Sequence, residues 1–78
     1  MKLITKNYNY NDYKIGDNVV TVCKCLDANV YINAGYYIGF NSTVSFSEDE
    51  HKRCFKSLTS VKKYIHTSLK QRGYIDAK

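Results

Sequence analysis

The chain has 78 residues and a mass of 9.0 kDa, which predicts a single small domain with no room for separate cofactor and substrate domains. Twelve Lys and Arg residues against seven Asp and Glu give a net charge of +5, and a hydrophobic content of 44% excludes a compositionally disordered chain. No apolar run reaches the roughly 18 residues of a membrane span, and the first residues lack the apolar core of a secretion signal. We therefore expect a soluble, leaderless, cytoplasmic protein with no membrane contact.

The N-terminal half has the composition of a sheet preceded by a polar segment. Residues 1–17 are rich in Tyr and Asn, which predicts either an edge strand at residues 2–6 or a mobile arm. A turn is expected at residues 15–18, and the β-branched residues that follow predict a strand over 19–25.

The clearest pattern in the chain is an alternation with a period of two. The apolar members all occupy even positions, namely Val30, Ile32, Ala34, Tyr36, Ile38 and Phe40. Such a period predicts a half-buried strand with one core face, in which Gly35 marks a bulge, a bend or a tight turn. Residues 43–47 resume the alternation and predict another strand with Val44 and Phe46 directed inward.

The C-terminal half predicts a helix. Residues 48–50 are all acidic and are expected at the tip of a hairpin, and residues 52–55 predict a last short strand with Cys54 or Phe55 inward. Ser57 is placed to cap a helix over 58–72, whose apolar stripe is formed by Leu58, Val61, Ile65 and Leu69. Gly73 follows where a C-terminal cap is expected.

These elements predict an α+β fold within one domain, 1–78. It consists of a small antiparallel sheet of three to five strands over 19–55, with 1–17 as an arm or an edge strand, and one C-terminal helix at 57–72 packed on one face of the sheet. The narrow apolar stripe of the helix requires a surface to pack on, and the even-numbered face of the sheet supplies it.

The positive charge is concentrated at the C-terminal end of the chain. Residues 1–47 carry four Lys and three Asp, for +1; residues 48–50 carry −3; and residues 51–78 carry eight Lys and Arg and one Asp, for +7. We expect a basic helical surface formed by Lys62, Lys63, His66, Lys70 and Arg72. Clustered Lys and Arg side chains bind nucleic-acid phosphates, but the same pattern also occurs on a helix face that contacts only solvent.

The odd-numbered sheet face is the second predicted binding surface, because it carries Tyr31 and Tyr37. Exposed aromatic residues on an open sheet stack on single-stranded bases, and Tyr is also a frequent anchor in protein–protein contacts. Cross-strand Tyr packing without any partner is the third alternative.

The three cysteines predict thiols in a reducing compartment, since a disulfide scaffold would have an even number. Cys23, Cys25, His51 and Cys54 offer four soft ligands, the number that a structural zinc ion requires. The C-x-C spacing of the first two lacks the turn that usually wraps zinc, so buried thiols are the favoured interpretation and no metal or other cofactor is predicted.

Catalysis has little support in the sequence. Neither His51 nor His66 belongs to a recognisable Ser-His-Asp or Cys-His arrangement, and there is no glycine-rich phosphate loop. We therefore expect a protein that is not an enzyme and has no catalytic residues.

In size, in its Lys, Asn and Tyr bias and in its layout of sheet followed by helix, the chain resembles small orphan proteins encoded by phages and other mobile elements, of which anti-CRISPR proteins are examples. Residues 55–65, a strand end that leads into a capped helix, contribute most to the resemblance. The resemblance implies a stoichiometric inhibitor or adaptor that docks on a host protein or ribonucleoprotein in the host cytoplasm. The alternative is a nucleic-acid-binding domain that binds DNA or RNA through the basic helix and the sheet tyrosines.

Overall fold

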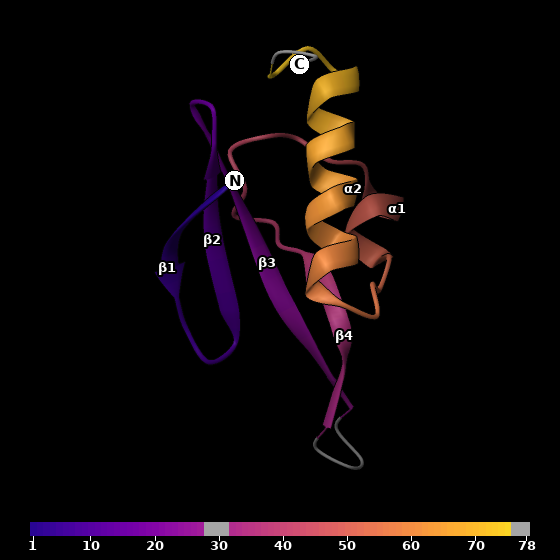
Figure 1. Cartoon of the computed structure of the whole chain (residues 1–78). Coiled ribbons are helices and arrows are strands. Elements are labelled where there is room, and N and C mark those ends of the chain that lie inside the picture. Colours follow the sequence, from indigo (N-terminus) through magenta and orange to yellow (C-terminus); the bar gives the residue numbers. More distant parts are fainter. Residues whose placement is uncertain (28–31, 76–78) are drawn as a thin grey trace.

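The computed structural model describes residues 1–27 and 32–75; the backbone alone is described at 26–27 and 32–34. Within these described residues, four strands form a single sheet in the order β1-β2-β3-β4 with every neighbouring pair antiparallel, and two helices follow (Figure 1). The elements are β1 (Lys2–Lys6), β2 (Tyr10–Ile15), β3 (Asn18–Asp27), β4 (Ile32–Ile38), α1 (Glu48–Lys52) and α2 (Leu58–Gln71). The predicted α+β fold, with one C-terminal helix on a small antiparallel sheet, is therefore confirmed.

The polar N-terminal segment is part of the sheet. The edge strand expected at residues 2–6 is present as β1, but the loop or arm expected after it is wrong, because residues 10–15 form β2. Tyr13 and Ile15 alternate with polar residues and are buried, so β2 contributes a core face despite its Asn and Asp content. Asp12 accepts a hydrogen bond from the Thr21 hydroxyl of β3, at 2.6 Å, which accommodates the carboxylate in the sheet.

The predicted alternation holds only in part of β4. Tyr36 and Ile38 face the core, but Phe40 is 75% exposed, because β4 ends at Ile38 and the chain turns away at Gly39. Gly35 has a φ of 138° and lies opposite a register shift of β3, so the predicted bulge is confirmed. Val30 and Tyr31 lie outside the described residues, as do the side chains of Ile32 and Ala34.

The strand expected at residues 43–47 is wrong, although its inward positions are right. The side-chain hydroxyls of Ser42 and Thr43 accept hydrogen bonds from backbone N–H groups of β3, at 3.0 and 2.9 Å. These hydroxyls take the place that backbone carbonyls would have in a paired strand. Val44 is buried and Phe46 packs against the core, so both residues contribute to the core although the segment does not form a strand.

The acidic residues 48–50 do not form a hairpin tip; they are the first turn of α1. Ser47 and Glu50 form a reciprocal capping box, and carboxylates in the first turn interact favourably with the helix dipole. The strand expected at 52–55 is reduced to one bridge between Tyr36 and Phe55, in which Phe55 is the buried residue and Cys54 is exposed.

The C-terminal helix agrees closely with its prediction. Ser57 caps the helix by accepting from the N–H of Ser60, and Gly73 follows the helix with a φ of 79°. The apolar stripe packs on the sheet face formed by β2, β3 and β4, and the core residues are Tyr13, Ile15, Val20, Val22, Ile38, Val44, Phe55, Val61, Ile65 and Leu69. Among the described residues, no helix has the length and apolar character needed to cross a membrane.

Candidate functional site

A basic cleft lies beside α2, on the side that faces the N-terminal strands. It is open, has a volume of about 410 Å³ and is lined by Met1, Thr59, Lys62, Lys63 and His66. Within the described parts of the chain, the lining contains no carboxylate. The cleft therefore offers positive charge without an acidic side chain in its own wall.

The sequence of α2 explains why these side chains gather. Residues 59, 62, 63 and 66 follow the i, i+3, i+4, i+7 spacing that places them on one helix face, next to the stripe of Val61, Ile65 and Leu69 that is buried against the sheet. Because the stripe fixes the rotation of the helix, the cleft residues must face the part of the sheet that α2 leaves uncovered.

The N-terminal strands form the other side of this region. Leu3 in β1 lies directly opposite Tyr13 in β2, so both side chains share the sheet face that carries α2. The Lys62 ammonium group lies 4.9 Å from the centroid of the Tyr13 ring, a cation–π contact. Met1 and Leu3 are 41% and 46% exposed, which gives the cleft an apolar border.

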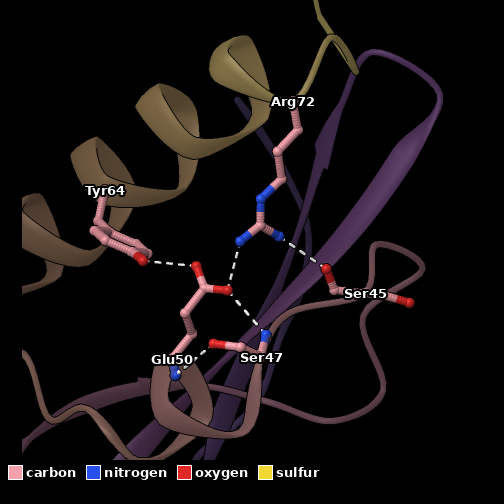
Figure 2. A network of polar contacts seen from close by, with 5 residues as sticks. All are labelled: Ser45, Ser47, Glu50, Tyr64 and Arg72. Atoms are coloured by element: carbon pink, nitrogen blue, oxygen red, sulfur yellow. Dashed lines mark hydrogen bonds and ion pairs between the residues drawn. The ribbon is translucent and has the colours of Figure 1, made fainter.

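The opposite side of α2 is held by a polar network (Figure 2). The Glu50 carboxylate accepts hydrogen bonds from the Tyr64 hydroxyl, the Ser47 backbone N–H and the Arg72 guanidinium. Arg72 also donates to the Ser45 carbonyl, at 2.8 Å. Burial alone would raise the Glu50 pKa, but these hydrogen bonds and the Arg72 charge outweigh it and lower the pKa to about 2.

Because of this polar network, the predicted basic surface loses one of its members, Arg72. Lys62, Lys63 and His66 lie together in the cleft as expected, whereas Arg72 lies on roughly the opposite side of α2, where it pairs with Glu50. Lys70 is half-buried in the last turn of the helix and does not line the cleft. The five predicted residues therefore do not form one surface.

The predicted tyrosine surface is separate from the cleft. Tyr37 lies directly opposite Cys23 on the sheet face away from α2 and is half-buried. The neighbouring Cys23 raises the Tyr37 pKa, and the two side chains are within hydrogen-bonding range. Tyr31 lies outside the described residues.

The four candidate metal ligands named from the sequence, where no metal was predicted, do not form one site in the structure. His51 donates from Nδ1 to the Ile38 carbonyl at 2.8 Å and stacks on Phe40, with ring centroids 4.1 Å apart. Cys25 lies close to Cys54, whereas Cys23 is next to Tyr37. Across residues 1–27 and 32–75, no group of three or more His, Cys, Asp or Glu side chains is arranged to hold a metal ion.

Sequence reasoning missed two members of the cleft. Thr59 could have been found from its spacing, since it lies one helical turn before Lys62 and Lys63. Met1 carried no such signal, because its position depends on how β1 pairs with the rest of the sheet.

No protein-family model, curated protein or solved structure matches the chain.

Proposed function

We propose that the chain is a small non-enzymatic binding protein that docks, through the basic cleft, on an acidic segment of a partner protein. The observation that supports this proposal is the convergence of Lys62, Lys63 and His66 with Met1 in one open cleft whose described lining lacks a carboxylate. Complementary charge attracts an acidic partner and sets its orientation. The cytoplasmic inhibitor or adaptor role implied by the resemblance to phage-encoded proteins is part of the same proposal.

The border of the cleft favours a protein partner. Met1 and Leu3 expose apolar surface beside the lysines, and β1 is an edge strand with all five residues exposed. A segment that combines acidic and apolar side chains would match both the charge and the border.

The arginines provide a second argument against nucleic-acid recognition as the main role. Both arginines of the chain make internal contacts: Arg72 pairs with Glu50, and Arg53 lies over the Phe55 and Tyr64 rings, at 4.7 and 5.0 Å. Arginine is the residue that most often reads guanine and grips phosphate with two parallel hydrogen bonds. The cleft contains lysines instead, and a lysine attracts an anion without forming two parallel hydrogen bonds to it.

The experiment is a fluorescence-anisotropy titration at two salt concentrations. The probes are a short labelled peptide rich in Glu with Leu at intervals, an uncharged peptide of equal length, and labelled single- and double-stranded DNA and RNA. We expect the acidic peptide to bind, with an affinity that falls as salt rises, because the contact is electrostatic.

The matched variants are the double substitution Lys62→Glu, Lys63→Glu and the control Lys14→Glu, Lys56→Glu, which makes the same change in net charge outside the cleft lining. The cleft variant should weaken peptide binding at least about tenfold, and the control should weaken it much less. Tighter binding of DNA or RNA than of the peptide would contradict the protein partner. An equal loss in both variants would contradict the cleft as the site.

A further inference from the structure

β1 lies at one end of the sheet and is paired on one side only. Within residues 1–27 and 32–75 its partner is β2 alone, and Figure 1 shows it at the margin of the sheet, far from β4. All five of its residues are exposed. Alternate residues of such a strand direct their backbone N–H and C=O groups outward, so β1 offers hydrogen bonds to a further strand.

The outer edge of β1 borders the basic cleft. Leu3 and Lys6 are paired with residues of β2 that lie on the sheet face carrying α2, so their side chains lie on that face. Met1, which directly precedes β1, lines the cleft together with Lys62 and Lys63. A strand that added to β1 would therefore have one of its two faces on the side of these lysines.

The charge of β1 disfavours a second copy of the chain as the added strand. If two copies paired in an antiparallel manner about Ile4, the central residue of β1, Lys2 of each copy would lie opposite Lys6 of the other. Like charges directly opposite each other destabilise a strand pair, and lysines on an edge strand are a common protection against self-association. An acidic strand would meet the same two lysines with opposite charge.

We propose that the acidic segment of the partner binds in an extended conformation, as a strand added to β1, with one row of its side chains directed toward the basic cleft. The inference rests on the proposed function, because it states how the same partner is held at the same cleft. The added strand would lie about 4.8 Å beyond β1. Its main-chain hydrogen bonds would supply affinity, and the lysines would select the acidic sequence.

This binding mode predicts the sequence pattern of the partner. Successive side chains of a strand point to opposite faces, so acidic residues at every second position would all lie on the face of Leu3 and Lys6. A helical segment would need acidic residues three and four positions apart instead. Peptides of equal composition can therefore separate the two modes.

The first test compares two labelled peptides made of the same numbers of Glu, Val and Thr. Glu occupies every second position in one peptide and recurs at helical spacing in the other. Anisotropy titration should give at least about fivefold tighter binding of the alternating peptide to the full chain. Equal binding of the two peptides, or tighter binding of the helically spaced one, would overturn the inference.

The charge of β1 is tested with matched variants. Lys2→Gln, Lys6→Gln should weaken binding of the alternating peptide several-fold, because it removes the two positive charges of the edge strand. The control Lys52→Gln, Lys56→Gln makes the same change in net charge outside β1 and outside the cleft lining. An equal loss of affinity in both variants would overturn the inference.

The second test removes backbone N–H donors from the alternating peptide. One form has N-methyl groups on three Glu residues, and the other has them on three of the intervening residues. Only alternate N–H groups of an added strand face its neighbour, so one form should bind at least about tenfold more weakly than the other. Equal affinities of the two forms would contradict an added strand.

Amide hydrogen exchange separates this inference from the proposed function. Addition of the alternating peptide should slow exchange within Lys2–Lys6 at least about tenfold. Peptide binding that is lost in Lys62→Glu, Lys63→Glu but leaves exchange in β1 unchanged would overturn the added strand and keep the cleft as the site. No binding of either peptide at low salt would contradict the proposed function, and this inference with it. Protection of β1 that rises with protein concentration in the absence of peptide would show a second copy at this edge and would also overturn the inference.

Discussion

Arg72, which immediately follows α2, donates to the carboxylate of Glu50 in α1, so that one ion pair joins the ends of the two helical regions. The Glu50 side chain is 11% exposed and that of Arg72 is 34% exposed, so the pair is only partly screened by solvent. The contact joins α1 to the end of α2 (Figure 2). Arg72 is not among the residues that line the basic cleft.

Replacement of Glu50 by Gln should lower the free energy of unfolding by about 1–2 kcal/mol at neutral pH. Gln keeps the size of the side chain and can accept from the Ser47 N–H, so the loss reports mainly on the charge. Urea unfolding followed by circular dichroism measures it. Lys52→Ala is the control, because its pair with Glu48 is highly exposed and its removal should cost less than about 0.5 kcal/mol.

The lowered pKa of Glu50 predicts that the free energy of unfolding decreases in acid. The Glu50 pKa is about 2 in the folded chain, below its ordinary value of 4.5, so the unfolded chain binds this proton first as the pH falls. The contribution of Glu50 is therefore complete above pH of about 4.5 and is lost as the pH falls toward about 2. Unfolding curves across this window should have a steeper pH dependence in the wild type than in Glu50→Gln, and equal slopes would contradict the assignment.

Gly35 and Gly73 provide a comparison between two glycines with positive φ. Gly35→Ala should destabilise the chain by at least about 3 kcal/mol, because the new methyl group would strike the Phe55 carbonyl and the Cys54 Sγ atom. Gly73→Ala should cost only about 1 kcal/mol, since open space surrounds it and only the backbone conformation is unfavourable. Chemical denaturation of the two variants measures the difference, and similar losses would show that the approach of Cys54 and Phe55 to Gly35 is not tight.

The cap of α2 can be tested in the same way. Ser57→Ala removes the oxygen that accepts from the Ser60 N–H, at 3.1 Å, and should lower stability by about 1 kcal/mol. Ser57→Asp retains an acceptor at the cap and should restore most of the loss. A midpoint of urea unfolding unchanged in Ser57→Ala would indicate that the cap contributes nothing to the folded chain.

Local patterns predicted the parts of the fold that depend on neighbours in sequence. The cap at Ser57, the stripe of Val61, Ile65 and Leu69, and the bulge at Gly35 follow from spacing and from backbone preference. Residues 10–15 form a strand that was not expected, and residues 43–47 do not form the strand that was expected. Both errors have the same cause, because composition does not reveal whether polar residues are hydrogen-bonded by a neighbouring strand.

The candidate site was predictable only along the helix. The spacing of Lys62, Lys63 and His66 indicated a shared face, and the structure places all three in the cleft. The position of Arg72 depends on Glu50, which lies 22 residues earlier in the chain, so the ion pair could not be deduced from the charge of α2.

The most direct test of the basic cleft is an NMR titration of the isotope-labelled chain with the Glu-rich peptide. We predict that the largest amide shifts occur at Thr59, Lys62, Lys63 and His66 and in the first residues of β1, and that they shrink at high salt. Shifts centred on Tyr37 and Cys23 on the opposite sheet face, or no shifts at low salt, would contradict the account.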